Sequence, residues 1–277
     1  MKTDAALLRR CAEAVREADG LLVTAGAGMG VDSGLPDFRG TQGFWRAYPA
    51  LGRARIAFEA IASPAAFDAD PRLAWGFYGH RLALYRRTEP HEGFAILMQV
   101  GGAMKNGTFV LTSNVDGQFG LAGYSGERVC EIHGSIHHLQ CMRGCSDKIW
   151  PATDFAPEID ADKCLLRSAL PVCPRCRGLA RPNILMFGDR GWIEARQQKQ
   201  YAALLAWLRQ VRRPVIVEIG AGTAIPSVRH FGEAARGVLI RINPTEPGVP
   251  KGKGFGLRTG GLEGIRRLRE ALSEKGR

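Results

Sequence analysis

Residues 21–28 read Leu-Leu-Val-Thr-Ala-Gly-Ala-Gly, a mostly apolar run that ends in glycines. A short run of this kind, bounded by turn residues, is typical of a parallel strand that is buried on both faces. Residues 4–19 precede it with apolar side chains at helical spacing, and Gly20 is a plausible helix stop. The stretch therefore predicts a helix, a buried strand and a glycine-rich turn, in that order.

The same alternation of helix and strand continues along the chain. Further strands are predicted over 108–112, 128–133, 182–187, 214–219 and 238–243, and helices over 49–90, 92–101, 194–210 and 261–274. Alternation of this kind predicts an α/β fold, a Rossmann-like parallel sheet with helices on both faces. Ligands of such sheets bind beyond the carboxyl ends of the strands, where the glycine-rich and polar segments of this chain fall.

One segment breaks this rhythm. Residues 133–180 hold two pairs of cysteines and several prolines, and they read as a small inserted module. We therefore expect a discontinuous Rossmann-type domain over residues 1–45, 91–132 and 181–277. The predicted helical insertion covers residues 46–90.

Composition limits the class of protein. The chain is 45% hydrophobic and 23% charged, as in ordinary soluble globular proteins, which excludes a fully disordered chain. Its 35 glycines show no G-X-Y period, which excludes collagen. The net charge of +11 is spread out without a basic tail, so specific nucleic-acid binding is not expected. With no secretory signal and no apolar run of about 20 residues, we expect a cytoplasmic protein without a membrane partner.

Four of the seven cysteines occur as closely spaced pairs, Cys141-x3-Cys145 and Cys173-x2-Cys176. Soft thiolates at this spacing suit a tetrahedral zinc ion, and four protein ligands leave no position open for catalysis. The sequence therefore predicts one structural zinc ion. Cys164 lies between the two pairs, and the sequence leaves open whether it takes part.

The glycine-rich turn continues as Gly26-Ala27-Gly28-Met29-Gly30 and then as Gly34-Leu35-Pro36-Asp37-Phe38-Arg39-Gly40. Glycines after a buried strand allow backbone N–H groups to approach a pyrophosphate. Val31 occupies the position where G-x-G-x-x-G would end, so the turn alone does not distinguish a nucleotide site from a tight turn.

With its continuation, however, this motif closely resembles the sirtuin family, the NAD-dependent protein deacylases. The resemblance extends in order through Asn114-Val115-Asp116, His133-Gly134, the paired cysteines, Phe187-Gly188-Asp189, Gly222-Thr223 and Ile242-Asn243. It covers nearly the whole chain. It implies a protein-lysine deacylase that uses NAD, binds zinc, and releases nicotinamide and O-acyl-ADP-ribose.

His133 and Asn114 are the expected catalytic residues. An imidazole at the end of a predicted strand can accept a proton near neutral pH, and the matching sirtuin histidine is the general base. The resemblance implies that Asn114 positions ribose and water and that Asp116 holds the nicotinamide carboxamide. Ser113 stands where the family commonly has glutamine. His137 and His138 are interpreted as structural or surface residues.

The resemblance also implies a set of binding residues. For NAD they are Gly26, Ala27, Gly28, Asp37, Phe38, Arg39, Ser113, Asn114, Asp116, Gly222, Thr223 and Asn243. The acyl-lysine substrate, a protein or peptide, would enter between the two parts of the chain. Its backbone would add as a strand near Phe187 and Gly188 and the segment after Gly222.

Tyr78 and Arg81 are three residues apart on a predicted helix and so share one face. A Tyr-x-x-Arg pair at this place resembles sirtuins that remove succinyl or malonyl groups, whose carboxylate the pair binds. The alternative interpretation is an ordinary amphipathic surface. The acyl group therefore stays open between acetyl and acidic chains.

Three residues depart from the family pattern: Gly30 and Ala224 replace serines, and Asp189 replaces a glutamate. They leave open a mono-ADP-ribosyltransferase or NAD hydrolase in place of a deacylase. A non-enzymatic module that senses NAD or ADP-ribose, or one that binds nucleic acid, is the third alternative. We expect the protein to be a monomer.

Overall fold

The computed structural model describes residues 2–37 and 40–274 of the chain. Its larger sheet has six parallel strands in the spatial order β11-β10-β9-β1-β2-β3. The strands are β1 (Gly20–Ala25), β2 (Thr108–Thr112), β3 (Val129–Glu131), β9 (Pro214–Ile219), β10 (Val238–Ile242) and β11 (Gly254–Leu257). This is the strand order of a Rossmann fold, whose winding reverses between β1 and β9.

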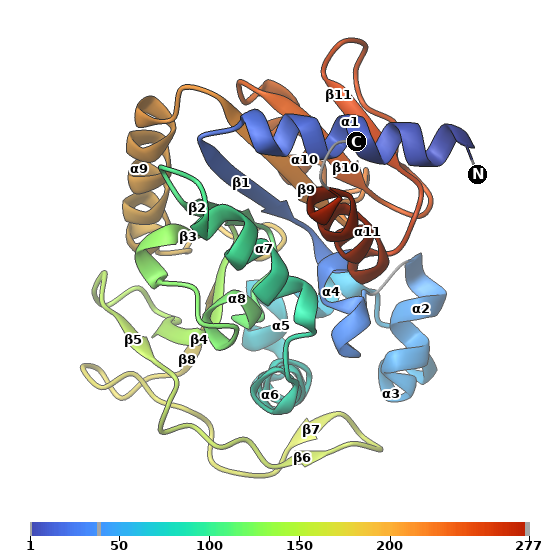
Figure 1. Ribbon diagram of the computed structural model, residues 1–277. Helices are drawn as coiled ribbons and strands as arrows, with labels where there is room; N and C mark the ends of the chain where they lie inside the picture. Colours follow the sequence, from blue (N-terminus) through green and yellow to red (C-terminus); the bar gives the residue numbers. More distant parts are fainter. Residues whose placement is uncertain (1, 38–39, 275–277) are drawn as a thin grey trace.

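Helices cover both faces of this sheet (Figure 1). One face packs against α1 (Lys2–Glu17), α7 (Glu92–Gly102) and α11 (Gly261–Ser273), and the other against α9 (Ala195–Gln210) and α10 (Ser227–Ala234). All residues of β1 and β9 are buried. Successive side chains of a strand point to opposite faces, so the apolar run of β1 supplies both layers of the core.

The rest of the chain forms a second part with its own apolar core, below the large sheet in Figure 1. Its antiparallel sheet has the order β5-β4-β8, and β6 pairs with β7 in a separate hairpin. These strands are β4 (Gly134–Cys141), β5 (Ile149–Pro151), β6 (Ile159–Asp160), β7 (Leu165–Leu166) and β8 (Ala180–Ile184). The helices are α2 (Gly40–Ala47), α3 (Pro49–Arg53), α4 (Phe58–Ile61), α5 (Pro64–Ala69) and α6 (Pro71–Arg87).

Short elements complete the structure at the strand ends. The helix α8 (Gln118–Leu121) follows β2, and 3₁₀ turns span Ala27–Met29, Val31–Ser33 and Gly126–Arg128. Pro64 and Pro71 begin α5 and α6, where a missing N–H costs no intrahelical bond. The predicted helical region 49–90 is therefore several helices punctuated by its prolines.

The predicted α/β class and its parallel sheet are confirmed, and the strands over 21–25, 108–112, 214–219 and 238–243 lie where the sequence placed them. The strand predicted over 128–133 is shorter, since β3 ends at Glu131 and His133 follows in a loop.

The strand predicted over 182–187 joins a different sheet from the one expected. As β8 it spans Ala180–Ile184 and pairs antiparallel with β4, outside the Rossmann sheet. Gly134 makes this pairing possible, because its φ is +81° and a Cβ there would lie 2.1 Å from the carbonyl oxygen of Asn183. The apolar residues 184–187 indicated burial but not the neighbouring strand, and β8 itself reads Ala-Arg-Pro-Asn-Ile, with Arg181 and Asn183 buried. The domain boundaries themselves stay a prediction.

Within residues 2–37 and 40–274, no helix combines the length and the apolar character needed to cross a membrane.

Candidate functional site

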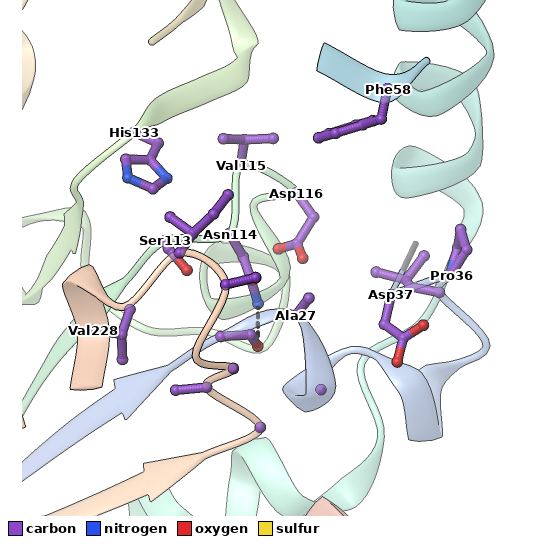
Figure 2. Close-up of a pocket in the computed structure, with 18 of the residues that line it drawn as sticks. Ala27, Pro36, Asp37, Phe58, Ser113, Asn114, Val115, Asp116, His133 and Val228 are labelled. Atoms are coloured by element: carbon purple, nitrogen blue, oxygen red, sulfur yellow. Dashed lines mark hydrogen bonds between the residues drawn. The ribbon is translucent and has the colours of Figure 1, made fainter. Parts of the chain in front are cut away.

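A cavity of about 1010 Å³ opens at the carboxyl ends of β1, β2 and β9, between the Rossmann sheet and the second part of the chain (Figure 2). Most of the predicted site residues line it. From the cofactor set these are Gly26, Ala27, Gly28, Asp37, Ser113, Asn114, Asp116, Gly222, Thr223 and Asn243, and from the others His133, Tyr78, Arg81 and Phe187. Gly188 is beside the cavity but does not line it, and Phe38 and Arg39 lie outside the described residues.

The glycines after β1 allow two loops to touch. A Cβ on Gly28 would lie 2.6 Å from the Cα of Gly220, the residue that follows β9. The N–H of Gly26 donates to the carbonyl of Ile219, and that of Gly28 donates to Gly220. These glycines therefore allow the loops after β1 and β9 to pack directly against each other at the bottom of the crevice.

Asn114 links the loops that follow β1 and β2. Its Nδ2 donates to the carbonyl oxygen of Gly26 at 2.9 Å, the dashed line in Figure 2, and its backbone N–H donates to Oγ1 of Thr112. With Nδ2 engaged, the amide oxygen Oδ1 is the acceptor that Asn114 can present to a ligand.

Asp116 is a buried carboxyl group on the cavity wall. Its Oδ1 accepts the backbone N–H of Gln118, which forms an Asx turn. Burial raises the pKa of Asp116 to about 6, with Glu131 adding to the rise and Arg81 opposing it. Its carboxylate is therefore ionised at neutral pH and sits in a poorly hydrated setting.

His133 faces Asn114 and Ser113 across one side of the cavity (Figure 2). Burial lowers the pKa of its imidazole, and a hydrogen bond with the backbone of Ser113 partly offsets this. A ring N–H donated to that backbone leaves the second ring nitrogen as an acceptor. The ring is thus held in its neutral form at pH 7, as a proton acceptor. His137, by contrast, bonds the backbone carbonyl of Asp116 from behind and does not line the cavity.

Arg81 and Tyr78 do not lie on the exposed helix surface that was the alternative interpretation. Arg81 is 9% exposed, and both residues line the cavity. The Arg81 guanidinium lies over the rings of Phe77, Tyr78 and Tyr85, with its carbon 5.2–5.8 Å from their centroids. A cation in an aromatic-walled cavity suits an anionic group of a ligand.

A buried ion pair fixes the loop after β8. The Arg181 guanidinium bonds both carboxylate oxygens of Asp189 at 2.8 and 2.9 Å, and both side chains are at most 2% exposed. Asp189 also accepts the N–H groups of Met186 and Gly191. The residue that departs from the family glutamate therefore holds the backbone of this loop from within.

Three apolar side chains stand exposed around the mouth of the cavity. Leu185 is 40% exposed, Phe187 39% and Ile225 49%, and all three line it. The N–H of Leu185 donates to the carbonyl of His133, so a backbone hydrogen bond links the loop at the cavity mouth to the segment that holds His133.

The structure adds residues that sequence reasoning missed. Tyr85, one helical turn after Arg81, lines the cavity, and so does Glu246, whose Oε1 accepts from Oγ1 of Thr223. Asn243 accepts the N–H of Glu246 and donates to the carbonyl of Ala221, which joins the loops after β9 and β10. An i, i+4 spacing from Arg81 could have indicated Tyr85. Glu246 follows no strand directly, so no comparable signal marked it.

The four paired cysteines converge, as their spacing predicted. All four Sγ atoms lie within 4.8 Å of one another, and two pairs of them are 3.6 Å apart. A tetrahedral zinc ion with Zn–S bonds of about 2.3 Å places its sulfurs about 3.8 Å apart, so the arrangement fits this ion. The ligands would be Cys141, Cys145, Cys173 and Cys176. Cys164 is buried and is not a member of this group.

Comparison with known proteins connects this site to a family. The family model described as the Sir2 family matches residues 26–207. A curated NAD-dependent protein deacylase from Aquifex aeolicus is 28% identical over 263 residues, which are 92% of this chain and 96% of the relative. One from Pyrococcus furiosus is 30% identical over 252 residues, 89% of this chain and 90% of the relative.

Comparison with solved structures also finds Sir2 homologues. A crystal structure of a Sir2 homologue in complex with NAD superposes with a TM-score of 0.70 at 26% identity. The match covers 98% of this chain and 95% of that structure.

Proposed function

The chain belongs to the Sir2 family, the sirtuins, and from this premise we propose that it is an NAD-dependent protein-lysine deacylase. The observation that carries the proposal is the cavity at the β1–β9 crevice, where His133, Asn114 and Asp116 meet. Curated relatives that match about nine-tenths of the chain are NAD-dependent protein deacylases.

The residues present fit a dinucleotide. The crevice lies where a Rossmann sheet binds such ligands, and close packing of Gly28 against Gly220 keeps its floor free of side chains. The residues that would hold NAD are those of the predicted set that line the cavity. When bound, NAD supplies a ribose carbon that becomes electrophilic as nicotinamide leaves.

The chain's own residues then have separate tasks. Asp116 accepts hydrogen bonds from the nicotinamide carboxamide, which a buried carboxylate does strongly. The Asn114 amide, fixed by its bond to Gly26, orients ribose and water through its oxygen. His133 accepts a ribose hydroxyl proton on the ring nitrogen that does not bond Ser113.

The peptide backbone adds as a strand between the loop containing Phe187 and the segment after Gly222. The exposed side chains of Leu185, Phe187 and Ile225 offer apolar contacts for it at the cavity mouth. The Arg181–Asp189 pair keeps the loop containing Phe187 in place before the substrate arrives.

We place the protein in the cytoplasm as a monomer without specific nucleic-acid binding.

The acyl group is the finer part of the proposal. Arg81 places a buried cation on the cavity wall beside Tyr78, and a planar guanidinium matches a carboxylate better than it matches an acetyl methyl group. We propose that succinyl- or malonyl-lysine is accepted together with acetyl-lysine.

The basic function is tested by incubating the purified chain with NAD and acetyl- or succinyl-lysine peptides. We expect nicotinamide release that matches the loss of acyl groups one to one. ADP-ribose attached to protein, followed by mass spectrometry in the same reaction, would favour a mono-ADP-ribosyltransferase instead. Nicotinamide release that does not depend on any peptide would indicate an NAD hydrolase.

Replacement of Arg81 tests the acyl preference. In Arg81→Met, the ratio of kcat/KM for succinyl- over acetyl-lysine peptides should fall roughly 10- to 150-fold, the range for a hydrogen bond to a charged group. The loss should appear mainly in KM, since the carboxylate lies away from the reacting atoms. An unchanged ratio would remove Arg81 from substrate recognition.

A further inference from the structure

Tyr85 is a cavity residue to which the proposed mechanism gives no task. It lies one helical turn after Arg81 on α6, is 4% exposed and lines the cavity. At this spacing the two side chains are neighbours on one helix face. Nε of Arg81 donates to Oη of Tyr85 at 2.9 Å.

This hydrogen bond limits how the guanidinium can meet a ligand. A guanidinium binds a carboxylate either side-on, through Nε and one Nη, or end-on, through both Nη atoms. Because Nε donates to Tyr85, the side-on pair of Nε and Nη is not offered to a carboxylate, and the Tyr85 hydroxyl lies at the Nε edge of the guanidinium in its place. The ring faces of Phe77, Tyr78 and Tyr85 further restrict the plane of the group.

The Tyr85 hydroxyl also has a proton of its own to give. Its oxygen accepts from Arg81, and a phenol that accepts in this way still has its O–H as a donor. Burial raises the pKa of Tyr85, with Arg81 opposing and Asp116 adding to the rise, so the phenol stays protonated at neutral pH. The cavity wall thus presents a fixed cation and a neutral donor side by side.

We propose that Tyr85 is a specificity-determining residue for acidic acyl groups, holding the Arg81 guanidinium through Nε and donating its own proton to an acyl carboxylate that binds at this edge of the guanidinium. This inference rests on the proposed function and assigns a third residue beside Tyr78 and Arg81. A succinyl or malonyl chain offers two carboxylate oxygens for these donors, whereas an acetyl group offers none at that position.

The test measures peptide affinity, which does not require turnover. Dissociation constants are determined by fluorescence anisotropy for one labelled peptide carrying either succinyl- or acetyl-lysine. The proteins are the wild type, Tyr85→Phe and the control Tyr124→Phe. Tyr124 is also buried, and its hydroxyl donates to the carbonyl of Phe94 in the Rossmann part, so the control likewise removes one bonded hydroxyl.

We expect the wild type to bind the succinyl peptide more tightly than the acetyl peptide. Tyr85→Phe should reduce this preference about 10-fold or more, the effect of losing a hydrogen bond to a charged group, and Tyr124→Phe should keep it within about twofold. Equal weakening of both peptides in Tyr85→Phe, or an unchanged preference, would overturn the inference.

Turnover of the same peptides with NAD separates this inference from the proposed function. If the wild type releases acetyl groups but binds the succinyl peptide no better, the role of Tyr85 is refuted and the deacylase activity stands. If no peptide is deacylated, the proposed function fails, while the dissociation constants still decide the role of Tyr85.

Discussion

His133→Ala should reduce kcat/KM for deacylation by about 100-fold or more, the usual contribution of a positioned general base. The reason is that no other imidazole among the described residues lines the cavity: His137 bonds the Asp116 backbone from behind. Fold and NAD affinity should persist, because the ring is only partly buried and bonds a single backbone group. Steady-state kinetics and a thermal unfolding curve measure the two effects.

His230→Ala is the matched control, since His230 is exposed and lies outside the cavity. Its activity should equal that of the wild type. Deacylation in His133→Ala within a few-fold of the wild type would exclude His133 as the base.

The pH profile gives a second measure of the same residue. Burial lowers the pKa of His133, so the neutral, proton-accepting ring is still the main form at the ordinary histidine pKa. The activity should therefore fall as the pH drops through this lowered pKa and through the pKa of Asp116, which burial raises to about 6. The measurement is kcat/KM as a function of pH between about pH 5 and 8. A midpoint of the acid-side fall above the ordinary histidine pKa of 6.5 would contradict the lowered pKa of His133.

Loss of zinc should loosen the small sheet, which is formed by β5, β4 and β8. Structural zinc sites contribute roughly 10–16 kcal/mol of apparent binding free energy in zinc-finger peptides, so Cys173→Ser or chelation should loosen β4 and β8. Elemental analysis should find about one zinc ion per wild-type chain. Amide hydrogen exchange should then speed up in the small sheet before it does in β1 or β9.

Cys164→Ser serves as the control for the zinc site, because Cys164 is a buried cysteine outside the four-sulfur group. Its zinc content should stay at about one per chain. Fully active protein without metal would refute the site, and zinc loss in Cys164→Ser would change its ligand assignment. Activity should fall after chelation, since β4 begins directly after His133 and the carbonyl of His133 binds Leu185.

The Rossmann sheet, the four-cysteine group and many of the polar and glycine residues that line the cavity could be predicted from the amino-acid sequence alone. Buried parallel strands can be predicted from apolar runs that are followed by glycine or polar residues, as in β1 and β2. Because carboxyl ends of parallel strands meet at one edge, Ser113 and Asn114 were predictable neighbours of Gly26. Motif order along the chain supplied their expected roles.

The pairing of β8 and the hydrogen bonds between side chains depended on tertiary packing and could not be read from the sequence. The apolar residues 184–187 reported burial but not the neighbouring strand, so the segment that holds β8 could not be assigned to the small sheet from its residues. The sequence spacing predicted that Tyr78 and Arg81 share one helix face. Only the packing of α6 beside the cavity shows that this face is buried. The Arg81–Tyr85 bond depends on that packing, because the same helix face in water would leave both groups solvated.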